Sequence, residues 1–251
     1  MEQSEINRSW SENSENYDSI IHNEYASFRT LAWQKQILSH FPEGKRLRIL
    51  DIGCGPAFFS IILSACGHDV IGIDGAEGML LRARANVSAA GSTATILEMN
   101  AASLQFPDAS FDLLVSRNVT HTLLNHVNTY KEWKRVLKPD GCLLIYDANW
   151  HLSETVPEVR ARCREDWHRC IVQFGSDYNG NTDPNGPSPY DGPTTEHPLA
   201  DLIRPDYDIG ILRAIGFRNV FFSRNIIENL WDEKEKVIYG FTPMFEICAK
   251  P

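Results

Sequence analysis

A glycine-containing turn at the end of an apolar run is the first feature of this sequence with a chemical meaning. The run that begins at Leu47 leads into Asp51-Ile52-Gly53-Cys54-Gly55. Because glycine has no side chain, the backbone there can approach a bound ligand closely. A second apolar run ends at Asp74, 19 residues after Gly55, and a carboxylate so placed can accept hydrogen bonds from both ribose hydroxyls. The two features together predict a nucleoside site.

The spacing of the glycines separates this site from two common nucleotide sites. A dinucleotide fingerprint would have a third glycine at position 58, which is Phe58 here. The sequence also lacks the G-x-x-x-x-G-K-[ST] pattern of a phosphate-binding loop. A nucleoside without a pyrophosphate fits better, and an NAD-type oxidoreductase remains a weaker alternative.

The elements that must position these residues alternate along the first 150 positions. Expected strands cover 47–52, 69–74, 95–99, 111–116 and 142–147, and expected helices cover 57–66, 79–90 and 129–137. The turn-forming residues 138–141 are expected to stop the last of these helices. Strands that alternate with helices indicate a parallel sheet with right-handed crossovers.

The regular alternation stops after the fifth expected strand. A helix is expected over 156–174, and the next segment, 175–199, holds five prolines and four glycines. Loops of that length are usually functional lids or disordered segments. Further expected elements are helices within the first forty residues, a helix at 207–215, and strands at 220–224 and 244–248.

Four blocks of sequence now carry a family resemblance. They are Ile49–Gly55, Asp74, Asn100–Asp112 and Arg135–Gly141. Together they resemble the class I, seven-strand, S-adenosylmethionine-dependent methyltransferases of the small-molecule and quinone-methylating type, over roughly residues 15–150. The resemblance implies an α/β fold: a doubly wound, mostly parallel seven-stranded sheet with helices on both faces. Its expected parts are an N-terminal helical cap (1–40), a cofactor-binding core (41–150), a helix and lid insertion (151–205) and a C-terminal part with a strand hairpin (206–251).

The resemblance also implies roles for individual residues in holding S-adenosylmethionine. Asp51, Gly53 and Gly55 would receive the methionine part, and Asp74 the ribose. The others are Gly75 and Met79 beside the adenine, Asn100 and Ala101 at its exocyclic amine, and Tyr17, Ser116 and Arg117 near the methionine end.

The expected chemistry asks little of the protein beyond alignment. Methyl transfer from a sulfonium is an in-line displacement by an acceptor atom, N, O, S or C, that the sequence does not identify. No metal is expected, and a base is needed only for a protonated acceptor, a task that suits histidine near neutral pH. His121 is the first candidate and His151 the second. Expected acceptor contacts are Asn118, His121, Trp150, Tyr178 and Tyr190.

A cysteine-containing stretch suggests a competing metal or thiol interpretation. Cys163, Trp167 and Cys170 are spaced by four and three residues, however, as on the buried face of a helix. We therefore expect a packing seam. The six cysteines form no Cys-x-x-Cys pair, which favours reduced thiols.

Composition narrows the function classes further. The 251-residue chain has a formal net charge of −9 and a pI near 5.4, which disfavours binding to a phosphate backbone. The polar start and the lack of a long apolar run predict a soluble cytoplasmic enzyme that acts on a small molecule, without nucleic-acid or membrane partners. The alternatives are another use of the same cofactor and a non-catalytic protein that binds S-adenosylmethionine or a partner.

Overall fold

One seven-stranded sheet organises the protein. The computed structural model describes residues 2–191 and 202–251. The strands lie in the order β3-β2-β1-β4-β5-β7-β6. They are β1 (Arg48–Ile52), β2 (Asp69–Asp74), β3 (Thr95–Glu98), β4 (Phe111–Arg117), β5 (Leu137–Asp147), β6 (Arg218–Ser223) and β7 (Phe245–Lys250). Only β7 runs antiparallel to its two neighbours. The predicted fold class is confirmed.

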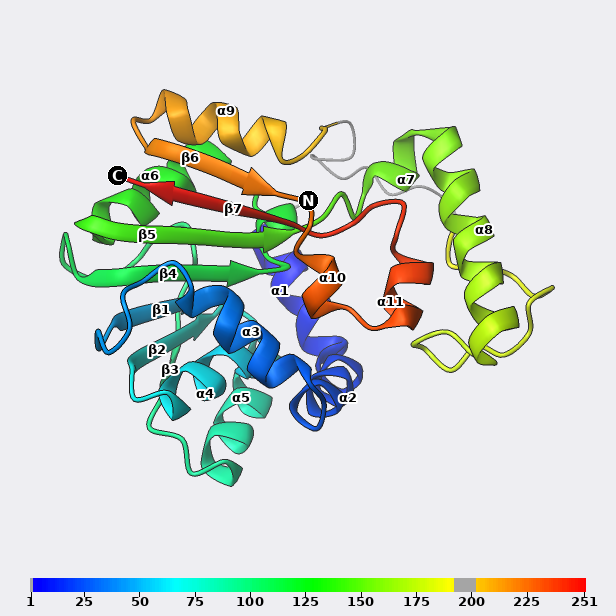
Figure 1. Cartoon of the computed structure of the whole chain (residues 1–251), viewed down its shortest axis with the longest axis horizontal. Coiled ribbons are helices and arrows are strands. Elements are labelled where there is room, and N and C mark those ends of the chain that lie inside the picture. The colour runs from blue at the N-terminus through cyan, green and yellow to red at the C-terminus, as the bar shows by residue number, and fades with distance from the viewer. Residues whose placement is uncertain (1, 192–201) are drawn as a thin grey trace.

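Helices cover both faces of the sheet (Figure 1). The N-terminal ones are α1 (Gln3–Glu12), α2 (Ser14–Tyr25) and α3 (Arg29–Leu38), followed by α4 (Phe58–Ala65), α5 (Glu77–Ala89) and α6 (His126–Val136). The later ones are α7 (Leu152–Thr155), α8 (Pro157–Phe174), α9 (Asp206–Ala214), α10 (Ile227–Leu230) and α11 (Glu233–Ile238). A short 3-10 turn spans Thr120–Thr122.

Alternating strand residues divide the core into two layers. Ile49 and Leu113 face a cluster that includes Trp33 of α3 and Phe59 of α4. Leu50, Leu114 and Ile145 belong to the opposite cluster, which includes Tyr130 and Trp133 of α6 and Leu212 of α9. Burial on both faces explains why β1 and β4 read as continuous apolar runs.

The first helices lie beside the arrow tips of the central strands, against α5 (Figure 1). Gly78 of α5 makes this approach possible, because a Cβ atom there would stand 2.5 Å from the Ser11 carbonyl oxygen. The Gly78 amide donates a hydrogen bond to the Ser11 Oγ at 3.2 Å. The N-terminal helices are therefore built against the carboxyl edge of the sheet.

Two boundaries differ from the sequence expectation. Helix α6 begins at His126, where Asn125 caps it by accepting from the Asn128 amide, rather than near position 129. Strand β5 begins at Leu137, and its range includes residues 138–141. Leu137 pairs with Phe111 of β4 and Cys142 pairs with Leu113, so residues 138–141 form an irregularity between two paired positions of this ladder.

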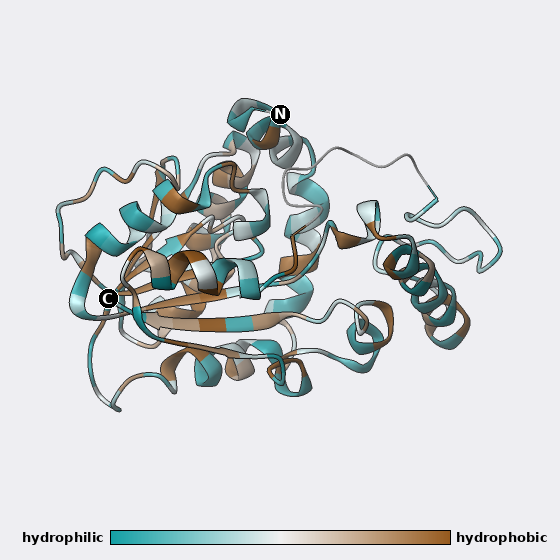
Figure 2. Ribbon diagram, turned by 90° about the horizontal axis from the view of Figure 1, so that it is seen from above, coloured by the Kyte–Doolittle hydropathy of each residue, from teal (hydrophilic) through white to brown (hydrophobic). Residues whose placement is uncertain are grey.

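The insertion after β5 stands away from the sheet. Helix α8 projects to one side in both views, with residues 175–191 beside it (Figure 2). Cys163, Trp167 and Cys170 are buried along α8. Trp167, Cys170 and Ile171 pack with Ile238 of α11. Of the segment 175–199 in which a lid was predicted, residues 192–199 lie outside the described part of the chain.

Candidate active site

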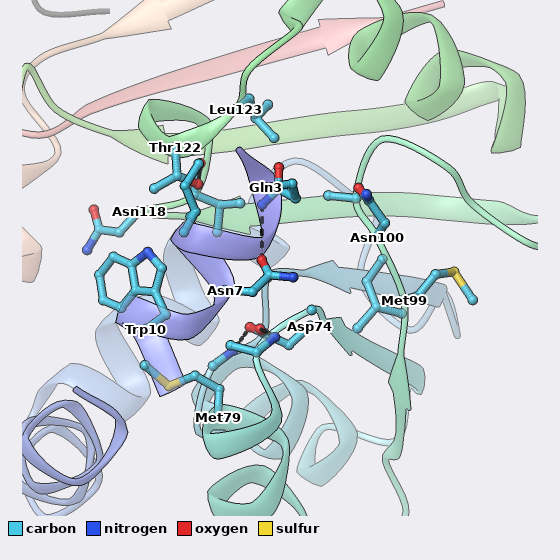
Figure 3. Close-up of a pocket in the computed structure, with 18 of the residues that line it drawn as sticks. Gln3, Asn7, Trp10, Asp74, Met79, Met99, Asn100, Asn118, Thr122 and Leu123 are labelled. Carbon is cyan, nitrogen blue, oxygen red and sulfur yellow. Dashed lines mark hydrogen bonds between the residues drawn. The ribbon is translucent and has the colours of Figure 1, made fainter. Parts of the chain in front are cut away.

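A cavity opens at the carboxyl ends of β1, β2, β3 and β4, below helix α1 (Figure 3). Its empty volume is about 750 Å³, which includes open solvent at its mouth. We call it the first cavity. The residues that line it are Gln3, Ile6, Asn7, Trp10, Tyr17, Gly53, Gly55, Ile73, Asp74, Gly75, Ala76, Met79, Met99, Asn100, Ala101, Arg117, Asn118, Val119, Thr122 and Leu123.

The turn after β1 requires glycine for two separate reasons. Gly53 has a φ of +66° and Gly55 a φ of +50°, in the left-handed region. A Cβ atom on Gly53 would also stand 2.3 Å from the Val119 Cγ2 atom. The bare turn therefore forms the floor of the cavity and leaves its backbone amides near any ligand.

Asp74 ties this turn to the end of β2. Its Oδ2 atom accepts from the Gly55 amide at 3.0 Å, and its Oδ1 atom accepts from the Ala76 amide at 2.8 Å. Each carboxylate oxygen keeps lone pairs for further donors. Burial raises the pKa of Asp74, whereas the backbone donors at Ala76 and Gly55 act in the opposite direction. Asp74 is thus a preset acceptor on the cavity wall.

At the far side of the first cavity, Met79 and Asn100 come from α5 and from the turn after β3. Met79 is buried, and Gly75 and Ala101 line the cavity next to it. The Asn100 Oδ1 atom already accepts from the Ala102 amide at 2.8 Å, which leaves it one lone pair. The Ala101 carbonyl accepts from the Trp133 indole at 2.8 Å, which fixes this turn on α6.

Helix α1 supplies a wall that sequence reasoning did not predict. Gln3, Asn7 and Trp10 line the cavity from one face of the helix (Figure 3). The Gln3 side-chain amide (Nε2) donates a hydrogen bond to the Asn7 Oδ1 atom at 3.0 Å. Gly75 allows this closure, because a Cβ atom there would stand 2.9 Å from the Asn7 Nδ2 atom. The sequence signal for this wall was the spacing of Gln3, Asn7 and Trp10, which are four and three residues apart and so fall on one face of a helix.

Charged groups gather at the opposite end of the glycine turn. Asp51 accepts from the Ser60 hydroxyl at 2.7 Å, and burial raises the pKa of Asp51 to about 6 against the opposing effects of Ser60 and Arg117. Arg117 pairs with Glu24 at 2.7 Å. Burial raises the pKa of Tyr17, whose ring lies beside these groups. Asp51, Tyr17 and Arg117 share a small recess with Gly53.

Ser116 is placed differently from its sequence neighbours. It is fully buried, and it lines neither the first cavity nor the small recess beside Asp51. Its hydroxyl has no hydrogen-bond partner among the described residues. The structure gives no direct support to a ligand contact by this side chain.

A second cavity of about 810 Å³ adjoins the first and shares Tyr17, Arg117 and Asn118 with it. It lies between α2, α3 and the C-terminal helices α10 and α11. Trp150 and Tyr178, both predicted acceptor contacts, line it. The other lining residues are Ile20, Glu24, Arg29, Trp33, Leu230, Trp231, Glu235, Tyr239 and Met244, none of which was predicted.

His121 sits behind the wall between the two cavities and lines neither of them. Its ring centroid is 6.5 Å from that of Trp10, which lines the first cavity, and 6.5 Å from that of Trp150, which lines the second. The His121 Nδ1 atom is 3.0 Å from the Asp147 Oδ1 atom. Because a carboxylate only accepts, this contact places a proton on Nδ1.

Asp147 is the centre of a buried polar network. Its carboxylate accepts from the Thr120 hydroxyl at 2.6 Å, the His121 amide at 2.9 Å and the Trp150 indole at 3.0 Å. It also pairs with the Arg204 guanidinium at 3.1 Å. Although burial alone would raise it, the charges of His121 and Arg204 hold the pKa of Asp147 well below its usual value.

Two other predicted residues lie apart from the cavities. His151 is within 2.6 Å of the Glu154 Oε1 atom, and burial lowers the pKa of His151. Tyr190 packs against the α8 cluster and borders a separate hollow with Arg160 and Arg164. Neither lines the first or the second cavity.

Two further structural facts bear on the site. Among residues 2–191 and 202–251, no group of three or more His, Cys, Asp or Glu side chains is arranged to hold a metal ion. Within the same residues, no helix combines the length and apolar character needed to cross a membrane.

Comparison with known proteins agrees with this architecture. Residues 50–145 match the family described as a methyltransferase domain. This segment of the chain is therefore similar to a methyltransferase domain. That segment contains the glycine turn, Asp74, Asn100 and His121, while the residues from α1 and α2 that line the cavities lie outside it.

Curated relatives match about half of this chain. A demethylmenaquinone methyltransferase of Geobacillus kaustophilus is 33% identical over 141 residues, which are 54% of this chain and 59% of that protein. A malonyl-[acyl-carrier protein] O-methyltransferase of Erwinia pyrifoliae is 36% identical over 110 residues, 44% of this chain and 40% of that protein. The chain spans about half the length of the curated relatives it matches.

Solved structures extend the likeness in fold to most of the chain. A SAM-dependent methyltransferase of Methanosarcina mazei is 22% identical, with a TM-score of 0.57 over 86% of this chain and 96% of that one. Phosphoethanolamine N-methyltransferase 2 of Haemonchus contortus, in complex with S-adenosyl-L-methionine, is 18% identical, with a TM-score of 0.57 over 88% of this chain and 51% of that one. The likeness in fold to these proteins therefore extends well beyond residues 50–145.

Proposed function

We propose that this protein transfers a methyl group from S-adenosylmethionine to a small molecule. The observation that carries the proposal is the first cavity, where the bare glycine turn and the preset acceptor Asp74 meet at the carboxyl edge of a methyltransferase core. A nucleoside fits such a cavity because the backbone can approach it and Asp74 has lone pairs left for ribose hydroxyls.

Within the first cavity, each end suits a different part of the cofactor. Asp74 holds the ribose, while Gly75, Met79, Asn100 and Ala101 border the adenine. Gly53, Gly55, Tyr17 and Arg117 receive the methionine part, and the Asp51 carboxylate attracts its ammonium group from the small recess that adjoins them. Helix α1 covers the site with Asn7 and Trp10, which exclude water from the reaction.

The second cavity holds the acceptor. It adjoins the first at Tyr17, Arg117 and Asn118, so a molecule bound there faces the methionine end of the cofactor site. S-adenosylmethionine supplies an activated methyl group, and the protein aligns the acceptor with it. His121, which Asp147 orients behind the wall between the cavities, is the base for an acceptor that arrives protonated, and it acts across that wall. Trp150 and Tyr178 hold the acceptor, and Tyr178 brings the described part of the proposed lid to the cavity.

The charge of the chain limits the range of substrates. A formal net charge of −9 repels a polyphosphate backbone, so the acceptor is a small molecule and not a nucleic acid. The proposed place of the reaction is the cytoplasm. Incubation with methyl-labelled S-adenosylmethionine and a pool of metabolites, followed by mass spectrometry, tests the activity. A labelled product confirms methyl transfer, whereas cofactor binding without any product favours a binding protein.

Replacement of Asp74 by Ala is expected to weaken S-adenosylhomocysteine binding by about 10- to 100-fold. Hydrogen bonds to a charged group contribute about 1.5–3 kcal/mol, and about 1.4 kcal/mol corresponds to a factor of ten. The change also frees the Gly55 amide from its partner. Isothermal titration calorimetry measures the effect. Asp69→Ala, at the exposed start of the same strand, is the matched control and should bind like the parent protein; equal affinities of both variants would remove Asp74 from the site.

Cofactor affinity is expected to depend on pH through Asp51. The carboxyl group has a raised pKa of about 6, and only its ionised form attracts the cofactor's ammonium group. Affinity should therefore be constant above about pH 7 and fall by about tenfold for each pH unit below 6. Calorimetric titrations of S-adenosylhomocysteine between pH 5 and pH 8 measure this. Asp51→Asn should bind more weakly at pH 7 and lose the dependence; a parallel dependence in that variant would assign the titration to another group.

A further inference from the structure

We propose that the second cavity selects an organic cation, so that the acceptor is a small amine methylated on nitrogen. This inference rests on the proposed methyltransferase function. It narrows the methylated atom of the acceptor from N, O, S or C to N. Three features of the cavity carry it: its aromatic lining, the pairing of its arginines, and an ammonium group already held by one of its rings.

Six of the fourteen residues that line the second cavity are aromatic. They are Tyr17, Trp33, Trp150, Tyr178, Trp231 and Tyr239. Tyr239 lies at the centre of a cluster, with ring centroids 5.6 Å from Trp150, 6.1 Å from Tyr178 and 6.0 Å from Trp231. Aromatic rings attract cations within about 6 Å of their centroids, and groups of such rings are used to bind substituted ammonium ions.

The cluster already holds one ammonium group. The Lys234 Nζ atom lies 4.8 Å from the centroid of the Tyr178 ring. It also donates to the Asp177 carbonyl at 3.1 Å and to the Ser176 hydroxyl at 3.3 Å. The Tyr239 ring also stacks on Tyr178, at an interplanar angle of 11°. A ring that lines this cavity is therefore already in contact with an ammonium group.

The charges around the cavity disfavour an anion. Arg117 is neutralised by Glu24 at 2.7 Å, and Arg29 is held by Asp232 at 2.8 Å and also by Glu235. With Lys234, these groups carry three negative and three positive charges, so they leave no net positive charge for an anion. Both arginines are already paired with carboxylates, and of the two only Arg29 keeps a buried atom, its Nε, without a hydrogen-bond partner among the described residues. The formal net charge of −9 over the whole chain favours a cation.

The reaction of such an acceptor balances without a further reagent. The bound ammonium first loses a proton to His121, in the role proposed above, or to water. The free electron pair on nitrogen then forms a bond to the methyl carbon, while the carbon–sulfur bond breaks and its electrons stay on sulfur. The products are a methylated ammonium ion and S-adenosylhomocysteine.

Choline and its neutral isostere 3,3-dimethylbutan-1-ol test the selectivity, because they differ in charge and hardly in shape. Each is titrated into the full chain saturated with S-adenosylhomocysteine, and tryptophan fluorescence and calorimetry report binding. We expect choline to bind at least about tenfold more tightly than the neutral alcohol. The anionic 3,3-dimethylbutanoate should bind most weakly. Equal or tighter binding of the neutral alcohol, or no binding of choline at tens of millimolar, would overturn the proposal.

Variants locate the effect in the second cavity. Trp231→Leu should weaken choline binding by about tenfold, and Trp150→Leu, at a less buried position, provides the same test if the first variant fails to fold. Trp10→Leu is the matched control, because Trp10 lines only the first cavity; it should weaken S-adenosylhomocysteine and leave choline affinity unchanged. Loss of S-adenosylhomocysteine binding by the parent protein would refute the methyltransferase proposal, whereas intact binding without cation selectivity would refute the inference alone.

Discussion

His121→Gln is expected to lower kcat by about 10²- to 10⁴-fold, the usual contribution of a positioned general base, and to leave S-adenosylhomocysteine affinity unchanged. The expectation rests on the contact between the His121 Nδ1 atom and Asp147, at 3.0 Å, which fixes the ring and its tautomer. Glutamine preserves much of the side-chain volume but cannot take up a proton. The measurement combines methyl-transfer kinetics with a calorimetric titration of the product cofactor.

A matched histidine variant shows whether the effect is specific. His22→Gln changes an exposed histidine of α2 that lines neither cavity, and should keep the parent kcat. If His121→Gln retained activity within about twofold, the reaction would need no base at this position. His121 would then be a structural partner of Asp147 and nothing more.

Asp147→Ala is expected to reduce the free energy of unfolding by about 3 kcal/mol, the lower part of the range for loss of one partner from a buried ion pair. Asp147 and Arg204 have side chains that are 0% and 2% exposed. The substitution leaves Arg204 with Asp208 as its remaining carboxylate partner, which limits the loss. It also strips the acceptor from Thr120, His121 and Trp150. Chemical denaturation at pH 7 measures the difference.

The pH dependence of stability gives a second check on Asp147. The folded protein holds the pKa of this carboxyl below its ordinary unfolded value of about 3.9. Its stabilising contribution is therefore fully present above about pH 4 and is lost as the pH falls below that value towards the folded pKa. Asp147→Ala should lose less stability than the parent on acidification. Asp108→Ala, which removes an exposed partner of Arg135, should cost about 0–1 kcal/mol; an equally small cost for Asp147→Ala would contradict the buried network.

Much of the fold and the floor of the cofactor cavity could be predicted because their signals are local. Gly53, Gly55 and Asp74 lie at the ends of two adjacent strands, and their residue types state what the backbone and the ligand need. The apolar runs of β1 and β4 are continuous because both sheet faces are covered. Such features are readable from one segment at a time.

The walls of both cavities were not predictable in the same way. Helix α1 is polar over most of its surface, so Asn7 and Trp10 read as surface positions until Gly75 and Gly78 are seen to admit the helix. The second cavity depends on α10 and α11, which follow β6 and return to the site from the C-terminal part of the chain. These helices reach the cavity only through the tertiary fold, and no local sequence pattern predicts that they line it.

The polar network around Asp147 shows a further limit. A sequence that ends a strand in aspartate gives no sign that the carboxylate will meet Arg204, more than fifty residues later. His121, which contacts the same carboxylate, is buried and lines neither cavity. Because His121 lies between Trp10 and Trp150, any catalytic action of its ring must cross the wall between the two cavities. The kinetics of the His121 variant test this directly.

The central claim is that the first cavity binds S-adenosylmethionine, and calorimetric titration with S-adenosylhomocysteine is its most direct test. We predict saturable binding with one site per chain, loss of most affinity in Asp74→Ala, and no binding of NAD under the same conditions. Absence of binding by both S-adenosylmethionine and S-adenosylhomocysteine at millimolar concentration would contradict the claim.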